Sequence, residues 1–191
     1  MNAFNLSEGN TFENIDFAEQ KMHNREFEQA VFVSCNFSNS HLSRNEFIDC
    51  TFERCNLTMT KLGNSGLKNV SFKDCKVLGL EFNHCNDFLF EVRFEKCILN
   101  YASFHRKKLK KTIFTDCSLV ETDFSEADLS ESCFHNCNLD GAVFRNTQLG
   151  GADFTTAYNF TIDPEANRMK KARFSLAGLR GLVSKYNLII E

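Results

Sequence analysis

An apolar side chain recurs at every fifth position of this sequence, and no other feature limits the possible folds as strongly. The series begins at Phe12 and reaches Phe82 in steps of five; after a two-residue slip it continues from Leu89 to Phe154. An α-helix has a period of about 3.6 residues and a β-strand a period of about two, so neither produces this spacing. The period predicts a chain that turns a corner after every five residues.

The position two residues before each apolar centre is usually occupied by a small residue. Examples are Ala30, Cys35, Ala102 and Ala127. Small side chains at this place suit the crowded interior of a narrow tube. The sequence has 21 phenylalanines, three tyrosines and no tryptophan, so the interior is expected to hold large rings without a polar group.

Cysteines give an independent measure of the coil length. They stand 20 residues apart in two runs, and the gap of 22 between the runs contains the two-residue slip. Four steps of five therefore make one coil, and each column of equivalent residues forms a ladder inside the tube. The cysteine ladder is Cys35, Cys55, Cys75, Cys97, Cys117 and Cys137. The phenylalanine ladder is Phe12, Phe32, Phe52, Phe72, Phe94, Phe114, Phe134 and Phe154.

This pattern resembles the pentapeptide-repeat family, whose idealised unit is A(D/N)LXX. The clearest copies are Ala127-Asp128-Leu129-Ser130-Glu131 and Ala152-Asp153-Phe154-Thr155-Thr156. The resemblance implies an all-β fold, a right-handed quadrilateral β-helix with four pentapeptides in each coil. We expect a solenoid of about seven coils in residues 1–156, followed in residues 157–191 by a capping and dimerisation segment with a short helix.

The C-terminal segment carries its own signals. Ser175 is expected to cap a helix from about Leu176 to Tyr186. Residues 162–176 are similar to the tails of the albicidin-resistance and microcin-immunity members of the family. That similarity implies a tail-to-tail homodimer, which would bury the apolar residues Leu179, Leu182, Val183, Leu188, Ile189 and Ile190.

The slip in the repeat falls within residues 83–90 and predicts a bulge or a small loop. Phe88 or Phe90 is the side chain expected to point outward there, and both are candidates for a contact. Two interpretations remain open: the bulge is a packing accommodation, or it is a contact point for a partner.

Sequence motifs for catalysis are not found. The chain has no phosphate-binding loop, nucleophile elbow or HExxH string. Cys133, His135 and Cys137 alternate in direction along the chain and should not converge on one metal ion. We therefore expect no enzyme activity, no metal and no cofactor; a solenoid enzyme acting on polysaccharide is the least favoured interpretation. The cysteine ladder is expected to be buried filling, with Cys85 and Cys133 as the most accessible thiols.

Composition favours a folded protein in a reducing compartment. The 191 residues are 42% hydrophobic, and no window approaches 18 consecutive apolar residues, so no membrane span is expected. The first residues lack the basic start and apolar core of a signal peptide. Nine cysteines without an export signal indicate free thiols, and the expected location is the cytoplasm.

Charge is segregated along the chain, although the net charge is only −3. Residues 105–115 hold a basic cluster and no acidic residue: Arg106, Lys107, Lys108, Lys110 and Lys111. Residues 116–153 hold eight acidic residues against Arg145 alone, a net charge of −7. The residues expected to face outward as an acidic band are Asp116, Glu121, Asp123, Glu126, Asp128, Glu131 and Asp140.

The family resemblance supplies a candidate partner. Quinolone-resistance, albicidin-resistance and microcin-immunity members bind DNA gyrase and topoisomerase IV and protect them from poisons, as rods that mimic duplex DNA. The acidic band would then stand in for phosphates in a basic groove, and no direct nucleic-acid binding is expected. The mild net charge and the basic cluster depart from that pattern. The alternative is a general protein-interaction scaffold whose partner is unrelated to DNA topology.

Overall fold

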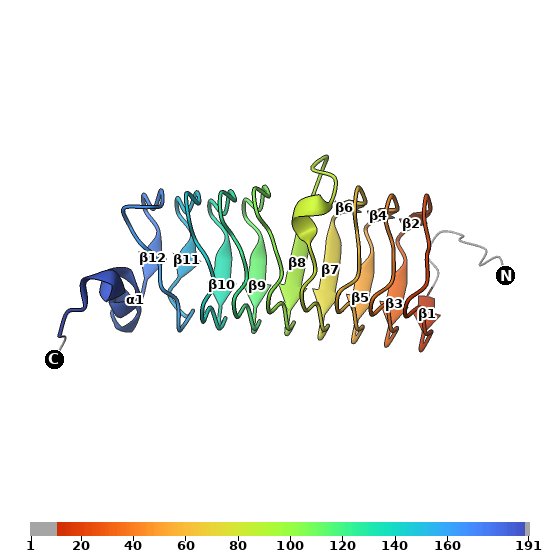
Figure 1. Cartoon of the computed structure of the whole chain (residues 1–191), viewed down its shortest axis with the longest axis horizontal. Coiled ribbons are helices and arrows are strands. Elements are labelled where there is room, and N and C mark those ends of the chain that lie inside the picture. The colour runs from red at the N-terminus through yellow and green to blue at the C-terminus, as the bar shows by residue number, and fades with distance from the viewer. Residues whose placement is uncertain (1–10, 190–191) are drawn as a thin grey trace.

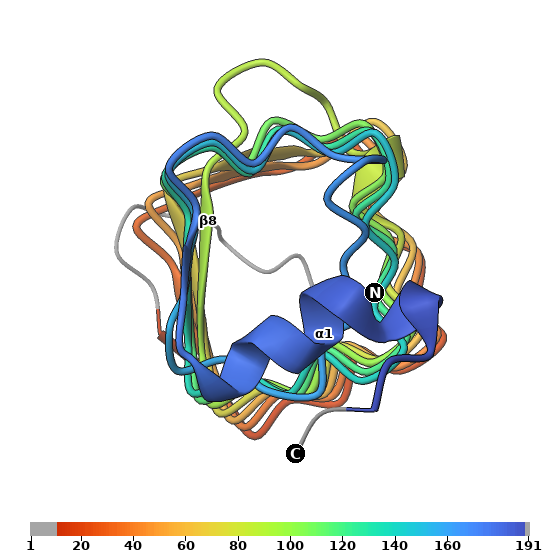
Figure 2. The same ribbon diagram turned by 90° about the vertical axis from the view of Figure 1, so that its left-hand side faces the viewer.

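The computed structural model describes residues 11–189 and confirms the predicted β-helix. Figure 1 shows a straight stack of coils, and Figure 2 shows along the axis that each coil is four-sided. The stack has about eight turns rather than about seven, because Phe174 pairs in parallel with Phe154 and adds a further coil. At about 4.8 Å between paired strands, the stack is about 38 Å long.

The first side of the tube carries a nine-stranded parallel sheet. Its strands are β1 (Thr11–Glu13), β3 (Val31–Val33), β5 (Thr51–Glu53), β7 (Val70–Lys73), β8 (Val92–Glu95), β9 (Ile113–Thr115), β10 (Cys133–His135), β11 (Asp153–Phe154) and β12 (Arg173–Phe174). The pairing register places each rung of the phenylalanine ladder beside the next, as the sequence predicted.

The chain then visits three further sides in each turn. The second is centred on Phe17, Phe37, Leu57, Val77, Leu99, Leu119 and Leu139, and the third on Met22, Leu42, Leu62, Phe82, Phe104, Phe124 and Phe144. The fourth is centred on Phe27, Phe47, Leu67, Leu109, Leu129, Leu149 and Met169. A three-stranded sheet of β2 (Glu26–Glu28), β4 (Glu46–Ile48) and β6 (Gly66–Lys68) lies on the fourth side.

Most corners contain one residue in the left-handed region of backbone conformation, two positions after the apolar centre. On the corner after the first side, Asn14, Arg54, Asp74 and Asp116 have φ between 51° and 54°. Only a residue with positive φ turns the chain this sharply, and asparagine and aspartate tolerate it better than most others. The corners explain why a period of five does not produce continuous strands.

Stacked aromatic rings fill the core beneath the first side. Along the phenylalanine ladder the ring centroids of successive rungs lie 4.8 to 5.4 Å apart with nearly parallel planes. Phe94 also meets Phe104 of the third side edge-on, at 5.9 Å and 76°. Inside the tube, the edges and the faces of the rings contact other rings. Rings without polar atoms suit this place because a polar atom would find no hydrogen-bond partner there.

Several of the small side chains at the inward positions donate hydrogen bonds to backbone carbonyl groups of the preceding coil. The thiols of Cys35, Cys55 and Cys75 each contact the carbonyl oxygen of a phenylalanine in the preceding coil at 3.2 to 3.3 Å. Thr60 donates in the same way to the carbonyl of Phe37 at 2.7 Å. A short side chain with a donor therefore stabilises each turn, since buried carbonyls need a hydrogen-bond partner.

The C-terminal end of the stack is covered by helical turns. The expected helix is present as η2 (Ala177–Leu179), α1 (Arg180–Val183) and η3 (Ser184–Tyr186), and Ser175 Oγ accepts a hydrogen bond from Gly178 N. Gly181 lies so close to Phe160 that an added Cβ would stand 2.2 Å from the Phe160 carbonyl oxygen. Figure 2 shows α1 lying across the end of the tube.

The aromatic ladder makes the core sensitive to truncation. Phe94→Ala should lower the free energy of unfolding by about 3–5 kcal/mol. The substitution would leave a cavity between Phe72 and Phe114, and the stacked coils hold these two rings too firmly for them to move together and fill it. Chemical denaturation would measure the loss. The control is Ile113→Ala in the neighbouring coil, where the side chain is 48% exposed and a change within about 0.5 kcal/mol is expected. Equal effects of the two variants would contradict the assigned register.

Thiol accessibility tests the inward columns. Eight of the nine cysteines are buried and Cys133 is partly exposed, so the expectation that Cys85 is accessible was wrong. Burial raises the pKa of the Cys50 thiol to about 11 and that of Cys85 to about 12, which leaves little reactive thiolate near neutral pH. A bulky thiol reagent should label native protein mainly at Cys133 and all nine cysteines in denaturant, as mass spectrometry would show. Rapid native labelling of the cysteine ladder would be incompatible with this packing.

Candidate functional site

The acidic band encircles the tube instead of forming one face. Its seven residues, from Asp116 to Asp140, span little more than one 20-residue turn. Asp116, Glu121, Glu126 and Glu131 occupy four successive corners with positive φ. A segment that is acidic in sequence therefore points in four directions in space.

Two acidic residues of the band are paired with the basic cluster of the preceding coil. Arg106 Nε lies 2.8 Å from Glu126 Oε2, and Lys110 Nζ lies 3.1 Å from Glu131 Oε1. Lys111 Nζ is 3.7 Å from the other oxygen of Glu131. The hydrogen bonds from Arg106 and Lys110 lower the pKa of these two carboxyl groups. Part of the band is thus neutralised by its neighbours.

Five members of the band make no ion pair within residues 11–189. These are Asp116, Glu121, Asp123, Asp128 and Asp140. Asp123 and Asp128 are half-buried and accept hydrogen bonds from the backbone N–H groups of Ser125 and Ser130 at 2.9 and 3.0 Å. These two carboxylates therefore also hold turns in place.

Three of the five unpaired acids, Asp116, Glu121 and Asp140, lie on the second side and its corners. Glu121 N donates to the carbonyl oxygen of Asp140 at 2.8 Å, so these two residues lie on adjacent coils. Asp116 is at the corner that enters this side, and Glu121 is at the corner that leaves it. The outward positions of this side from Ile98 to Asp140 carry no lysine or arginine. This acidic second side is the most negative surface that the band provides.

The basic cluster does not lie wholly on the surface. Lys107 is only 2% exposed, whereas its four neighbours in the cluster are exposed. It occupies an inward position, two residues before the centre Leu109, in a column with Ser65, Cys85 and Ala127. Sequence reasoning missed this residue, although its place in the repeat was a signal that could have found it.

The two-residue slip forms a segment, residues 86–91, that projects from the fourth side (Figure 2). Phe88 is 64% exposed, as expected, but so is Leu89, which the repeat had placed in the core. Phe90, the other candidate for an outward side chain, is half-buried, with its ring 6.4 Å from that of Phe82. The register resumes at once, because Val92 pairs with Val70 in the neighbouring strand.

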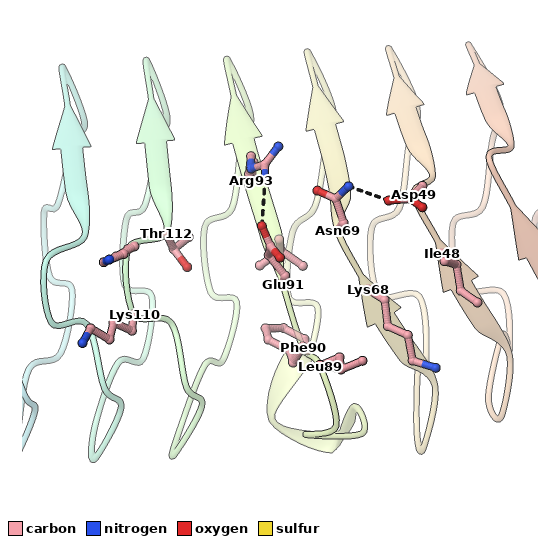
Figure 3. A pocket seen from close by; sticks show the side chains of 12 residues that line it. Ile48, Asp49, Lys68, Asn69, Leu89, Phe90, Glu91, Arg93, Lys110 and Thr112 are labelled. Atoms are coloured by element: carbon pink, nitrogen blue, oxygen red, sulfur yellow. Dashed lines mark hydrogen bonds and ion pairs between the residues drawn. The ribbon is translucent and has the colours of Figure 1, made fainter.

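A groove of about 580 Å³ lies beside the projecting segment and is open to solvent (Figure 3). Leu89 and Phe90 form one part of its lining, and charged side chains of both signs form the rest. Asn69 Nδ2 donates to Asp49 Oδ1 at 2.5 Å, and Arg93 donates to Glu91 at 2.8 Å. Its walls hold an apolar end and a polar rim, which is the composition of a protein-contact surface.

Exposed apolar side chains also gather at the C-terminal end. Leu179, Leu188 and Ile189 are 45%, 59% and 92% exposed. Leu182 packs against the core, so it contributes less to a free face than the sequence suggested, and Val183 is half-buried. Ile190, the last residue of the expected dimer face, lies outside the described residues.

Family models match most of the repeat region. A model of the pentapeptide repeat region matches residues 45–118, and a model of pentapeptide repeats in eight copies matches residues 26–58 and 122–158. The chain belongs to the pentapeptide-repeat family. No curated protein sequence matches it significantly.

Solved structures of pentapeptide-repeat proteins share this fold. A trypsin-treated, singly substituted form of QnrB1, a plasmid-mediated fluoroquinolone resistance protein, superposes with a TM-score of 0.73 at 15% identity, covering 100% of this chain and 95% of QnrB1. Full-length QnrB1 gives 0.60 at 17% identity, with 94% and 100% covered. HetL of Nostoc sp. strain PCC 7120, a pentapeptide-repeat protein involved in heterocyst differentiation regulation, gives 0.43 at 14% identity, with 87% and 89% covered.

Between residues 11 and 189, no helix has the length and apolar character needed to span a bilayer. In the same range, histidine, cysteine and carboxylate side chains do not gather in threes around a point where a metal could bind.

The C-terminal face generates a prediction about assembly. If Leu179, Leu188 and Ile189 form a two-fold interface, light scattering should give about twice the 21.9 kDa chain mass. The double variant Leu179→Glu and Ile189→Glu should then be a monomer, because charges would be buried without partners. Val143→Glu, at a side chain 46% exposed on the third side, is the control and should leave the mass unchanged. A wild-type monomer at micromolar concentration would exclude the dimer.

Proposed function

We propose that this pentapeptide-repeat protein is a non-catalytic cytoplasmic rod that binds DNA gyrase or topoisomerase IV and protects the enzyme from poisons such as fluoroquinolones. The observation that carries the proposal is the superposition with QnrB1 along the whole of this chain. The two proteins share the length of the stack as well as its cross-section. A rod of that length is the part of the molecule that a topoisomerase would meet.

Catalysis is not part of the proposal, since the surface is convex and its grooves are shallow. An enzyme pocket buries most of its substrate, whereas the groove beside the projecting segment is open along one side of a rod. A stiff patterned surface suits recognition of a large partner. The nine unpaired cysteines fit a reducing cytoplasm.

The acidic second side is the surface that we assign to DNA mimicry. Asp116, Glu121 and Asp140 present carboxylates there with no cation paired to them in the described chain. Glu126 and Glu131 are already paired and have less charge to offer. A basic groove that attracts phosphates would therefore meet this side first.

A matched pair of triple variants tests this assignment. The variant Asp116→Asn, Glu121→Gln and Asp140→Asn removes three charges from the second side, and the hydrogen bond from Asn136 to residue 116 can persist. Protection of gyrase supercoiling against ciprofloxacin should require roughly tenfold more of this variant, and added salt should weaken the wild-type complex. The control variant Glu126→Gln, Asp128→Asn and Glu131→Gln removes three charges from the same turn and should protect almost as well as the wild type.

The results separate the levels of the proposal. A wild-type protein that neither binds nor protects gyrase or topoisomerase IV would refute the function. Equal protection by the two triple variants would refute DNA mimicry by the second side, but the topoisomerase would remain the proposed partner.

The second candidate function is a general interaction scaffold with a partner unrelated to DNA topology. It is favoured by the pairing of Arg106 with Glu126 and of Lys110 with Glu131, which leaves much of the surface without a dominant sign. Binding to neither topoisomerase, together with a stable folded rod, would select this candidate.

A further inference from the structure

The insertion that breaks the repeat consists of two residues whose removal would restore it. Residues 85–91 read Cys85-Asn86-Asp87-Phe88-Leu89-Phe90-Glu91. Without Asp87 and Phe88 this becomes Cys-Asn-Leu-Phe-Glu, the same form as the regular repeat that begins Cys55-Asn56-Leu57. Backbone hydrogen bonds of Asn86 to Ser65 (2.8 Å) and of Glu91 to Leu67 (2.9 Å) mark the limits of the distortion.

The insertion turns one core side chain outward and adds another beside it. Leu89 adopts a φ of 56°, and both Leu89 and Phe88 are 64% exposed. Phe88 N donates to Asn86 Oδ1 at 3.0 Å, which closes the start of the turn. The projecting segment that carries these two exposed apolar side chains lies near mid-length of the rod (Figure 1).

A buried lysine directs its ammonium group at the same segment. Lys107 Nζ donates to the carbonyl oxygen of Cys85 at 2.6 Å and to Asp87 Oδ1 at 2.6 Å. It also lies 4.6 Å from the centroid of the Phe90 ring, in a cation–π contact. The inserted Asp87 is thus the counter-ion of a lysine that is 2% exposed, and a charge buried so deeply requires such a partner.

The column that contains Lys107 holds smaller side chains in the coils nearest to it. These are Ser65, Cys85, Ala127 and Thr147, all small and buried, whereas the column begins with the half-buried Arg25 and the buried Asn45. Ser65 Oγ donates to the Leu42 carbonyl of the preceding coil. Lys107 likewise donates to a carbonyl of the preceding coil, and its three further carbons carry the ammonium group to Asp87 and the Phe90 ring.

We propose that Lys107 and the inserted Asp87–Phe88 pair form one docking device, in which the buried ammonium fixes segment 86–91 so that Phe88 and Leu89 enter an apolar pocket on a protein partner. This proposal rests on the proposed function, and the partner is the topoisomerase surface that the rod contacts. Side chains fixed before binding lose little freedom on binding, which favours affinity. Lys68, Glu91 and Arg93 line the groove beside Leu89, and Lys68 Nζ lies 5.6 Å from the centroid of the Phe88 ring. Charged side chains therefore border the apolar pair, as a polar rim borders a contact hot spot.

A double-mutant cycle in the free protein tests the coupling. Deletion of Asp87 and Phe88 leaves Lys107 buried without its counter-ion and should lower the melting temperature. Lys107→Ala leaves Asp87 without its cation and a gap beneath the segment, and it should also destabilise. The combined variant is a regular coil with alanine in the column, as at Ala127, and should melt at least as high as the wild type. Additive losses in the combined variant would overturn the coupling.

The combined variant then tests docking in a rod that is still folded. It should protect gyrase at least tenfold less well than the wild type, and so should Phe88→Ser with Leu89→Ser, which keeps Lys107 and Asp87. The control is Ile113→Ser with Val143→Ser, at side chains 48% and 46% exposed on the first and third sides, and it should lose less than threefold. Full protection by the combined variant would overturn docking while the proposed function stands. Failure of the wild type itself to protect would overturn the proposed function and the partner assigned here, and the melting cycle would still decide the coupling.

Discussion

Parallel stacking of each coil on the one before is the constraint on which every other feature of this molecule depends. The stacking places residues that are 20 apart side by side, so each inward position forms a column of its own. Phenylalanine rings stack on phenylalanine rings, and thiols and hydroxyls contact carbonyls of the preceding coil. An insertion must be absorbed within one side, since a shift carried forward would move every later core residue to the surface. Segment 86–91 meets that condition, because the Val70–Val92 pair restores the register.

The same stacking decides how charge is distributed. Two residues of opposite charge that are 20 residues apart occupy the same place in adjacent coils and can form an ion pair, as Arg106 and Glu126 do. Neighbours in sequence, by contrast, separate onto different sides of the tube. A run of acidic residues therefore becomes a ring around the tube that is partly neutralised. The surface stays acidic only where the adjacent coil places no cation beside the carboxylate. On the second side these carboxylates are Asp116, Glu121 and Asp140.

The acidic second side and the projecting segment on the fourth side lie on opposite sides of the square cross-section (Figure 2). A flat partner surface would meet only one of them. A partner that encloses a rod, as a groove for duplex DNA does, would meet both and would sense the charge and the apolar knob together. The fold is shared with other pentapeptide-repeat proteins, so the identity of the partner must depend on these surface features and not on the coil itself.

The sequence by itself determined the fold, because a strict period fixes which positions face inward wherever the repeat is regular. It also determined both ladders, the place of the slip and the helical cap at Ser175. Only the tertiary structure decided that Leu89 lies outside, that Phe90 turns partly inward and that the inward Lys107 pairs with Asp87. Within an irregular coil the choice among competing side chains depends on the space and the carbonyls that the adjacent coils provide. The tertiary structure likewise decided that Glu126 pairs with Arg106 and that Glu131 pairs with Lys110. An ion pair requires proximity in space, whereas the acidic band was defined by proximity in sequence.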